Sequence, residues 1–233
     1  MKCIILAGGF GTRLGNLAAG KAKGLIEYKS KPLVTHIINK VPEDVNILLS
    51  TNRKFEVDFR KWQETINRDV EICVEPAVSN EQRLGATGSL NFWIENKAIT
   101  EDLLVIASDN YFEFDLAQFI AVYDGKNTLV AVYDIGDKSK ASQFGVVELN
   151  GHRIVAFEEK PAEPRSSIIT TAIYILPPRI FPLLSQYCSQ GRRDNLGDFI
   201  AYIMDRDEVR AYVFSEFWID IGSGGNKGLF AAK

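Results

Sequence analysis

The sequence predicts an α/β protein with a mostly parallel central sheet. In the first half of the chain, short apolar runs alternate with longer amphipathic ones, which is typical of parallel strands joined by crossover helices. The runs at 2–7, 103–107 and 128–133 are almost entirely apolar, as expected of strands that helices cover on both faces. The 233 residues, 46% of them hydrophobic, are enough for a substantial buried core.

The expected elements follow the chain in order. Strands are predicted at 2–7, 45–50, 70–75, 103–107 and 128–133, and helices at 33–41, 55–66, 88–96 and 116–123. Beyond residue 133 the pattern predicts a hairpin of 144–149 and 154–159, a strand at 167–176, helices at 178–187 and 196–204, strands at 209–214 and 217–219, and a short helix from 223. Asn150-Gly151 is a strong signal for the two-residue hairpin turn. We therefore expect a mixed β-hairpin region added to the parallel sheet.

Composition excludes several classes of protein. A formal net charge of −3 argues against nonspecific nucleic-acid binding, which needs a dominant basic surface. Cys3, Cys73 and Cys188 are odd in number and lie in or near apolar stretches, so we expect a reduced, cytoplasmic protein. No apolar run approaches the ~20 residues that cross a bilayer, and the first run is too short for a signal sequence. A homo-oligomer is compatible with the composition, but no feature decides the oligomeric state.

A glycine-rich loop directly follows the first predicted strand. Gly8, Gly9 and Gly11 allow a sharp turn that brings backbone N–H groups close to an anion. Arg13 adds a planar, permanently charged donor group, and Lys21 and Lys23 follow closely. The loop is therefore a candidate phosphate site.

Three other interpretations of this loop compete. A dinucleotide fingerprint lacks its third glycine, and no acidic residue ends the second strand. Residues 15–21 match the start of a P-loop, but Ala22 replaces the Ser or Thr that binds magnesium. A plain strand-to-helix turn explains the glycines but not the adjacent arginine and lysines. The loop alone leaves a phosphate site and a plain turn open.

Further blocks of sequence resemble the sugar-1-phosphate nucleotidyltransferase family, glucose-1-phosphate thymidylyltransferases included. In chain order they are LAGGFGTRL at 6–14 with Lys23 and Lys31-Pro32-Leu33, LGATGSL at 84–90, Ser108-Asp109-Asn110, Phe144-Gly145-Val146-Val147, Glu159-Lys160-Pro161, and Trp218 to Gly222. The resemblance implies a Rossmann-like three-layer α/β/α fold in a single domain over 1–233. It also implies a nucleotide-binding half at 1–133 and a sugar-phosphate-binding half at 134–233, without the C-terminal β-helix of longer relatives.

The implied reaction joins a nucleoside triphosphate and a sugar 1-phosphate and releases pyrophosphate. Its nucleophile, a phosphate oxygen, is already ionised, so positioning and charge neutralisation replace a general base. The resemblance assigns Arg13 to the β- and γ-phosphates, Lys23 to the α-phosphate and Lys160 to the sugar phosphate. His36 and His152 are expected to be structural.

The nucleotide site is implied by the same resemblance. Its residues are Leu6, Ala7, Gly8, Gly9, Gly11, Thr12, Arg13, Gln82 and Gly85. Gly85 would approach the nucleobase with its backbone, and Gln82 or Glu81 would bind the base edge. The segment 79–88 would serve equally well as a polar loop that caps the next helix.

Two acidic residues are candidate Mg²⁺ ligands. Asp109 follows a buried strand, and the carboxyl ends of strands are where open α/β sheets bind ligands. Asp220 follows the apolar Phe217-Trp218-Ile219. Mg²⁺ favours a few carboxylates together with substrate phosphates and water. Taken singly, either acid could instead be a helix N-cap or a turn residue.

For the sugar phosphate, the resemblance implies Asn110, Gly145, Glu159, Lys160 and Thr171. Glu158-Glu159-Lys160 could also form an ordinary charged hairpin end.

Asp109-Asn110 is most similar to the thymidylyltransferase form, so dTTP or UTP with glucose 1-phosphate is expected. Phosphocholine or a molybdopterin as the acceptor, and an inactive nucleotide-sensing homologue, stay open as alternatives.

Overall fold

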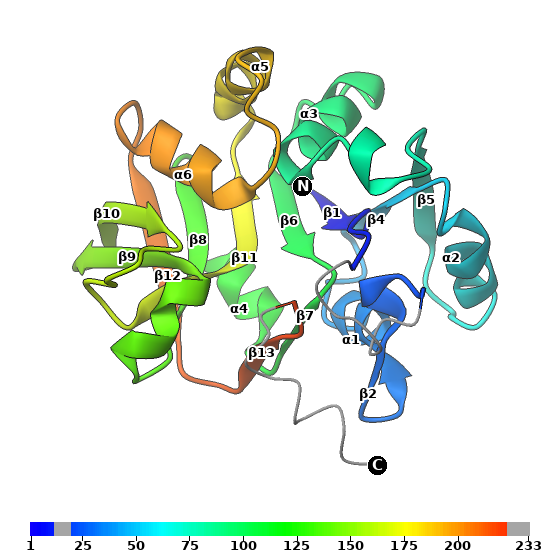
Figure 1. Cartoon of the computed structure of the whole chain (residues 1–233), viewed down its shortest axis with the longest axis horizontal. Helices are drawn as coiled ribbons and strands as arrows, with labels where there is room; N and C mark the ends of the chain where they lie inside the picture. Colours follow the sequence, from blue (N-terminus) through cyan, green and yellow to red (C-terminus); the bar gives the residue numbers. More distant parts are fainter. Residues whose placement is uncertain (12–19, 223–233) are drawn as a thin grey trace.

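A nine-stranded sheet forms the centre of the protein in a computed structural model that describes residues 1–11 and 20–222 (Figure 1). Its strands, in the order β5-β4-β1-β6-β11-β8-β12-β10-β9, are β5 (Val70–Glu75), β4 (Asn46–Asn52), β1 (Lys2–Leu6), β6 (Leu103–Ala107), β11 (Ile168–Leu176), β8 (Thr128–Asp134), β12 (Val209–Phe214), β10 (Arg153–Glu159) and β9 (Gly145–Asn150). Two small sheets pair β2 (Glu27–Tyr28) with β3 (Lys31–Pro32), and β7 (Asn110–Phe112) with β13 (Trp218–Asp220).

Six α-helices and four 3₁₀-helices connect these strands within the described residues. The α-helices are α1 (Leu33–Ile38), α2 (Glu56–Gln63), α3 (Ala86–Asn96), α4 (Leu116–Ala121), α5 (Phe181–Ser189) and α6 (Leu196–Met204). The 3₁₀-helices are η2 (Lys23–Leu25), η3 (Asn80–Gln82), η4 (Lys138–Gln143) and η5 (Pro178–Ile180). None of the helices in this part of the chain has the length and apolar character needed to cross a bilayer.

The sheet is mixed, with a parallel part formed by the first half of the chain. β5, β4, β1 and β6 pair in parallel, as predicted. The expectation of a mostly parallel sheet with a mixed region added outside it needs correction, because β11 lies between β6 and β8 and is antiparallel to both. β11 enters the sheet directly after the β9–β10 hairpin, so no crossover helix forces it to run parallel. Its nearly continuous burial suits this central position.

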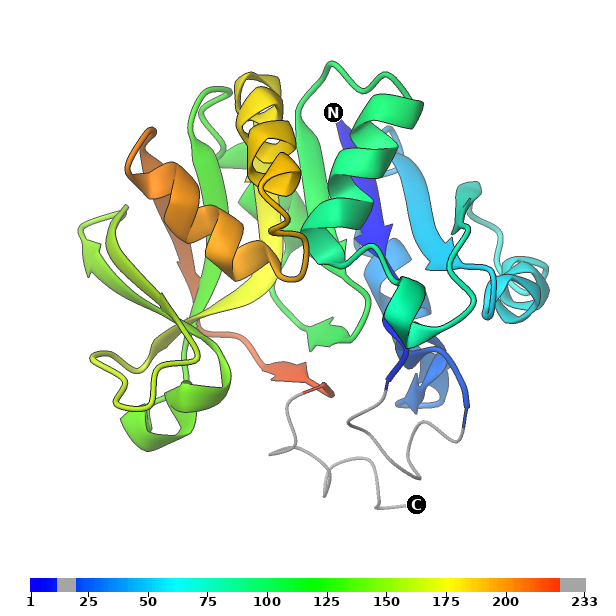
Figure 2. The same cartoon turned by 45° about the horizontal axis from the view of Figure 1, so that its top comes forward.

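Two apolar cores lie on opposite faces of the sheet. Side chains of successive strand residues alternate between faces, and on β1 Cys3 and Ile5 join one core whereas Ile4 joins the other. The first core contains residues of α1, α2 and α4, and the second contains residues of α3, α5 and α6. Figure 2 shows α3, α5 and α6 together in front of the sheet. Helices therefore cover both faces, and the strand ends are left to form a site.

The predicted elements differ from the observed ones mainly at short segments. The helix expected at 33–41 ends at Ile38, four residues before Pro42. The hairpin of β2 and β3 and the strand β7 were not predicted, because two or three residues are too few for a periodic pattern. The helix expected from 223 lies outside the described residues.

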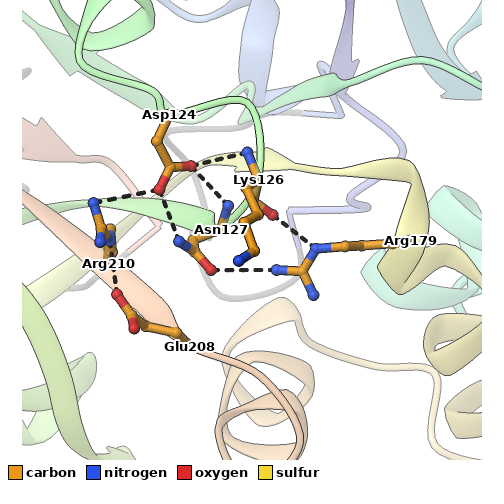
Figure 3. A network of polar contacts seen from close by, with 6 residues as sticks. All are labelled: Asp124, Lys126, Asn127, Arg179, Glu208 and Arg210. Carbon is orange, nitrogen blue, oxygen red and sulfur yellow. Dashed lines mark hydrogen bonds and ion pairs between the residues drawn. The ribbon is translucent and has the colours of Figure 1, made fainter.

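A network of polar contacts joins the amino ends of β8 and β12 to the chain that follows β11 (Figure 3). Arg179 donates from Nε to the carbonyl of Lys126 at 2.8 Å and forms an ion pair of 2.5 Å with Asp207. Asp124 accepts from the backbone N–H of Lys126 and of Asn127, at 2.9 and 2.7 Å. The Asp207 side chain is only 11% exposed, so its charge depends on Arg179.

We predict that Arg179→Ala lowers the free energy of unfolding by about 1–3 kcal/mol, because a nearly buried carboxylate and a carbonyl both lose their donor. Arg60→Ala is the matched control. Arg60 pairs with Glu56 on the exposed face of α2, where a pair contributes about 0.5 kcal/mol or less. Urea unfolding measures both variants, and equal unfolding midpoints would contradict this role for Arg179.

Candidate active site

A cleft of about 890 Å³ lies where β1, β4, β5 and β6 end. It brings together most of the residues that the sequence analysis selected: Leu6, Gly8, Gly9, Gly11, Lys23, Gly85, Asp109, Asn110, Gly145, Glu159, Lys160, Thr171 and Asp220 all line it. Ala7 and Gln82 do not line it. Thr12 and Arg13 lie outside the described residues, so their expected contacts stay predictions.

The start of the glycine loop is fixed by hydrogen bonds to the end of β4. Ala7 donates its N–H to the carbonyl of Ser50 at 2.7 Å. The Asn52 side chain donates to the carbonyl of Gly8 at 2.9 Å and accepts from the N–H of Phe55 at 3.2 Å. Asn52 is fully buried, so the end of β4 holds the loop in place. The backbone at Gly8 and Gly9 is thereby presented to the cleft.

The two predicted metal ligands reach the cleft on paired strands. β7 and β13 are antiparallel, and Asp220 lies opposite Asn110 in their register. Ile221 donates its N–H to the carbonyl of Asp109 at 3.1 Å, which extends the contact by one more residue. Two segments that are far apart in the sequence therefore bring one carboxylate each to the same edge of the cleft.

Three charged groups converge at this edge. Asp109 Oδ2 and Asp220 Oδ1 lie 2.8 and 2.9 Å from the point that a Cβ on Gly222 would occupy. Lys23 Nζ lies 2.9 Å from the same point and forms an ion pair of 2.9 Å with Asp109 Oδ2. The Lys23 and Asp109 side chains are 22% and 20% exposed, so solvent screens this pair only in part. The arrangement places a cation and two anions where phosphates could bind.

These carboxylates fit a Mg²⁺ ion that is shared with substrate. Within residues 1–11 and 20–222, no group of three or more His, Cys, Asp or Glu side chains could hold a metal by itself. Mg²⁺ does not require such a cage, since it is commonly bound by one or two carboxylates, water and phosphate oxygens. Asp109 and Asp220 supply the carboxylates, and the remaining ligands would come from substrate and water.

Two predicted sugar-phosphate contacts have side chains that are already engaged. The Asn110 side chain accepts from the Trp218 indole N–H at 2.7 Å and donates to the carbonyl of Ala107 at 3.1 Å. Thr171 donates its hydroxyl to the carbonyl of Ala131 at 2.9 Å. Asn110 therefore ties β7 to β13, and Thr171 ties β11 to β8. Both polar side chains therefore already have partners within the protein.

Glu159 and Lys160 form the opposite wall of the cleft, at the end of β10. Their side chains are 3.3 Å apart. Burial raises the pKa of the Glu159 carboxyl, and the Lys160 ammonium opposes that shift. Lys160 has φ of 48°, a left-handed conformation that costs a non-glycine residue about 1–2 kcal/mol, and its N–H bonds to the carbonyl of Phe144 at 2.9 Å. Such strain is often found at binding sites.

Gly197 in the first turn of α6 leaves room for Glu159. A Cβ at Gly197 would lie 2.2 Å from Glu159 Oε2, so the carboxylate would have to move from its observed position. A Cβ at Gly145 would lie 3.1 Å from the same oxygen. The two glycines therefore enclose the Glu159 carboxylate. Gly197 was not predicted, because nothing in the sequence indicates that α6 packs against β10.

Glycine is required at position 85 for a structural reason, apart from the expected contact with a nucleobase. Its φ is +78°, and a Cβ there would lie 2.0 Å from the carbonyl oxygen of Arg193. That carbonyl accepts from the N–H of Gly88 at 3.1 Å, and the carbonyl of Asp194 accepts from the N–H of Ala86 at 2.9 Å. The chain at 193–194 thus caps α3 and closes this side of the cleft.

An acidic residue beside Gly8, Glu75, was not predicted to be functional. It ends β5, is 2% exposed, and lines the cleft with Oε1 3.4 Å from the position of a Cβ on Gly8. Glu81 and Gln82, the residues expected to bind the base edge, do not line the cleft, and Gln82 Oε1 accepts from the N–H of Val78. Its place at the carboxyl end of a strand, where open α/β sheets bind ligands, is the signal that could have identified Glu75.

Known proteins resemble this chain over most of its length. A family model described as nucleotidyl transferase matches residues 2–226. The bifunctional protein GlmU of Methanocaldococcus jannaschii is 30% identical over 95% of this chain and 51% of its own length. Mannose-1-phosphate guanyltransferase 2 of Candida glabrata is 28% identical over 95% of this chain and 61% of its own. The chain thus spans about half to three fifths of these curated relatives.

Solved structures share the fold. UDP-glucose pyrophosphorylase in complex with UDP-glucose superposes with a TM-score of 0.80 at 20% sequence identity, covering 99% of this chain and 97% of the other. At this identity the likeness establishes the α/β fold and its mixed sheet, and the chemistry has to be argued from the cleft.

We predict that Gly85→Ala lowers the free energy of unfolding by about 3–4 kcal/mol. The new Cβ would collide with the Arg193 carbonyl, and the alanine backbone would be held at an unfavourable positive φ. Gly191→Ala is the matched control, since Gly191 has φ of +81° and nothing within 4 Å of its Cβ position. In Gly191→Ala the free energy of unfolding should fall only by the cost of the positive φ, about 1–2 kcal/mol. Equal losses in the two variants, measured by chemical unfolding, would rule out the close approach at Gly85.

Proposed function

Because the chain belongs to the nucleotidyl transferase family, we propose that its cleft transfers a nucleotidyl group from a nucleoside triphosphate to a sugar 1-phosphate and releases pyrophosphate. One observation carries the proposal: Asp109, Asp220 and Lys23 converge on one point at the edge of the cleft. The glycine loop borders the same cleft on one side, and Glu159 and Lys160 border it on the other. The triphosphate belongs to the half at 1–133 and the sugar phosphate to the half at 134–233.

The residues of the cleft have complementary tasks in this reaction. An ionised oxygen of the sugar phosphate forms a bond to the α-phosphorus of the triphosphate, and the bond from that phosphorus to the pyrophosphate oxygen breaks. The backbone at Gly8 and Gly9 holds phosphate oxygens, and Lys23 neutralises charge that develops at the α-phosphate. Lys160 holds the sugar phosphate, while the Glu159 carboxylate accepts hydrogen bonds from sugar hydroxyls. Arg13 is proposed to bind the departing pyrophosphate.

Asp109 and Asp220 are proposed to hold Mg²⁺. The ion would supply charge neutralisation and alignment of the phosphates at this edge of the cleft. Lys23 already forms an ion pair with Asp109. Its ammonium is therefore positioned to contact the same phosphates that the ion would bind.

We predict that purified protein with Mg²⁺ releases pyrophosphate only when both a nucleoside triphosphate and a sugar 1-phosphate are present. Asp109→Asn should lower turnover by about 10²-fold or more, because it removes one charge from the convergent site. Asp44→Asn, which changes an exposed acid far from the cleft lining, is the control.

Repeating the pyrophosphate-release assay with other phosphorylated acceptors tests the alternative functions. Phosphocholine or a molybdopterin as the only active acceptor would replace the sugar phosphate in the proposal. Nucleotide binding without pyrophosphate release for any acceptor would identify a sensor and contradict the enzymatic proposal.

The buried Glu75 favours guanine as the nucleobase. A carboxylate accepts hydrogen bonds, and guanine offers two neighbouring donors, N1–H and the N2 amino group, on one edge. Uracil and thymine offer N3–H between two carbonyl oxygens, which a carboxylate would repel. Glu75 borders Gly8 in the cleft and is therefore close to any nucleotide whose phosphates the loop binds. The guanyltransferase of Candida glabrata is a relative that supports the same choice.

A second candidate, dTTP or UTP, is favoured by a different observation. Burial raises the pKa of the Glu75 carboxyl. A protonated carboxyl has one donor and one acceptor, which is the complement of N3–H and an adjacent carbonyl of uracil or thymine. The protonation state of Glu75 thus distinguishes the two candidates.

We predict that Glu75→Gln lowers kcat/KM for GTP by about tenfold or more and improves it for UTP, because the amide keeps one acceptor but replaces the other with a donor. Competition between GTP and UTP with one sugar 1-phosphate measures the ratio. Glu81→Gln, close in sequence but outside the cleft lining, is the control. An unchanged preference in Glu75→Gln would exclude Glu75 from base recognition.

A further inference from the structure

We infer that Ser50 and Trp93 are positioning residues that hold the Glu75 side chain as a hydrogen-bond acceptor and thereby decide which nucleobase the cleft takes. The inference rests on the proposed function, specifically on the role of Glu75 in binding the base. Ser50 lies near the end of β4, and Trp93 lies on α3, so the two residues reach Glu75 from different elements.

A continuous chain of buried hydrogen bonds connects the three side chains. The Trp93 indole N–H donates to Ser50 Oγ at 2.8 Å, and Ser50 Oγ donates to Glu75 Oε1 at 2.7 Å. Trp93 is 7% exposed, Ser50 0% and Glu75 2%. Water is therefore largely excluded from these groups, and each bond is stronger than it would be in solvent.

The direction of this chain is set by chemistry. An indole N–H can only donate, so the Ser50 oxygen is the acceptor in the first bond. The hydroxyl hydrogen of Ser50 points at Glu75, and Oε1 accepts it. Hydrogen bonds from Ser89 and Trp93 act on the carboxyl in the same sense, so donors surround Glu75. The arrangement consequently favours a Glu75 that presents acceptors to the cleft, as guanine recognition requires.

The position of the chain indicates a role in the site rather than in the core alone. Ser50 and Glu75 line the cleft, and Trp93 packs behind them in the apolar core that α3 shares with α5 and α6. A buried carboxylate is costly to maintain unless donors compensate it, so a core function would be served better by an apolar residue. A buried acid that lines a cleft and has a raised pKa is a candidate functional group.

The sign of the expected pH effect follows from this geometry. Burial raises the pKa of the Glu75 carboxyl, whereas hydrogen bonds from Ser50, Ser89 and Trp93 lower it, in that order of size. Removing the Ser50 hydroxyl should raise the pKa further, so the protonated form persists to a higher pH. GTP binding then weakens at low pH and recovers as the pH rises and Glu75 ionises. UTP binding should follow the opposite course.

The test is the binding of GTP and UTP to the whole chain in the presence of Mg²⁺, measured by calorimetry between about pH 6 and about pH 8.5. Ser50→Ala should weaken GTP binding about tenfold at the acidic end, with the loss shrinking toward the alkaline end. The wild type should prefer GTP with a weaker pH dependence. Ser50→Thr, which keeps the hydroxyl, should restore both the preference and the pH profile.

Trp93→Phe provides a second variant that keeps an aromatic ring but removes the donor. It should reduce the preference for GTP in the same direction as Ser50→Ala, and by less, because the Ser50 hydroxyl remains. Trp62→Phe is its matched control. Trp62 is a buried tryptophan on α2 that donates to the Thr35 hydroxyl at 2.8 Å, away from the cleft lining, so nucleotide preference should not change.

The outcomes separate this inference from the function on which it rests. A wild type without any preference for GTP over UTP would overturn the guanine assignment itself. A wild type that prefers GTP, together with an unchanged preference and pH profile in folded Ser50→Ala, would overturn the positioning role alone. If Ser50→Ala does not fold, the same conclusion follows from an unchanged preference in Trp93→Phe.

Discussion

The pairing of β7 with β13 is the constraint on which the rest of the site depends. These two strands have three residues each, and their residues are joined by the hydrogen bond from Trp218 to Asn110, 108 positions apart in the chain. The bond is buried, so it is not weakened by competition with water. Because Asp109 precedes one strand and Asp220 ends the other, this single pairing brings both carboxylates to Lys23.

The same tryptophan connects this pairing to the far wall of the cleft. Its ring lies edge-on to Phe144, with ring centroids 5.5 Å apart, and Phe144 immediately precedes Gly145. The carbonyl of Phe144 in turn accepts the N–H of Lys160. A displacement of Trp218 would therefore be transmitted to the proposed metal ligands and to the proposed sugar-phosphate contacts together. The chain at 193–194, which caps α3, provides a second connection between the two halves.

Much of the fold was predictable, because the long apolar strands and amphipathic helices have clear periodic patterns. The order of strands was not, since the insertion of β11 between β6 and β8 depends on tertiary pairing that no local pattern encodes. Asp109 was identified because it follows a long apolar run. The pairing of β7 with β13 was not foreseen, because strands of three residues leave no periodic signal.

The hydrogen-bond partners of the candidate site's side chains could not be predicted from the sequence. The sequence selected Asn110 and Thr171 as polar contacts, but their side chains bond to groups on other strands. Gln82 was selected because it precedes Gly85, yet η3 directs it to the N–H of Val78. Glu75 was not selected, because its strand contains Glu71 and lacks the uninterrupted apolar run that precedes Asp109. Such partners are set by the packed structure and are invisible in a single sequence.

The central claim is that the pairing of two strands builds a two-carboxylate site for a metal ion and a nucleotide. It is tested most directly by titrating Mn²⁺ into the protein in the presence of a non-hydrolysable nucleoside triphosphate. Electron paramagnetic resonance follows the free ion. The account predicts nucleotide-dependent Mn²⁺ binding in the wild type and its loss in Asp109→Asn and in Asp220→Asn. Binding should be weaker in Trp218→Phe, which removes the indole hydrogen bond to Asn110 and leaves the backbone pairing of the strands. Unchanged Mn²⁺ binding in both aspartate variants would contradict it.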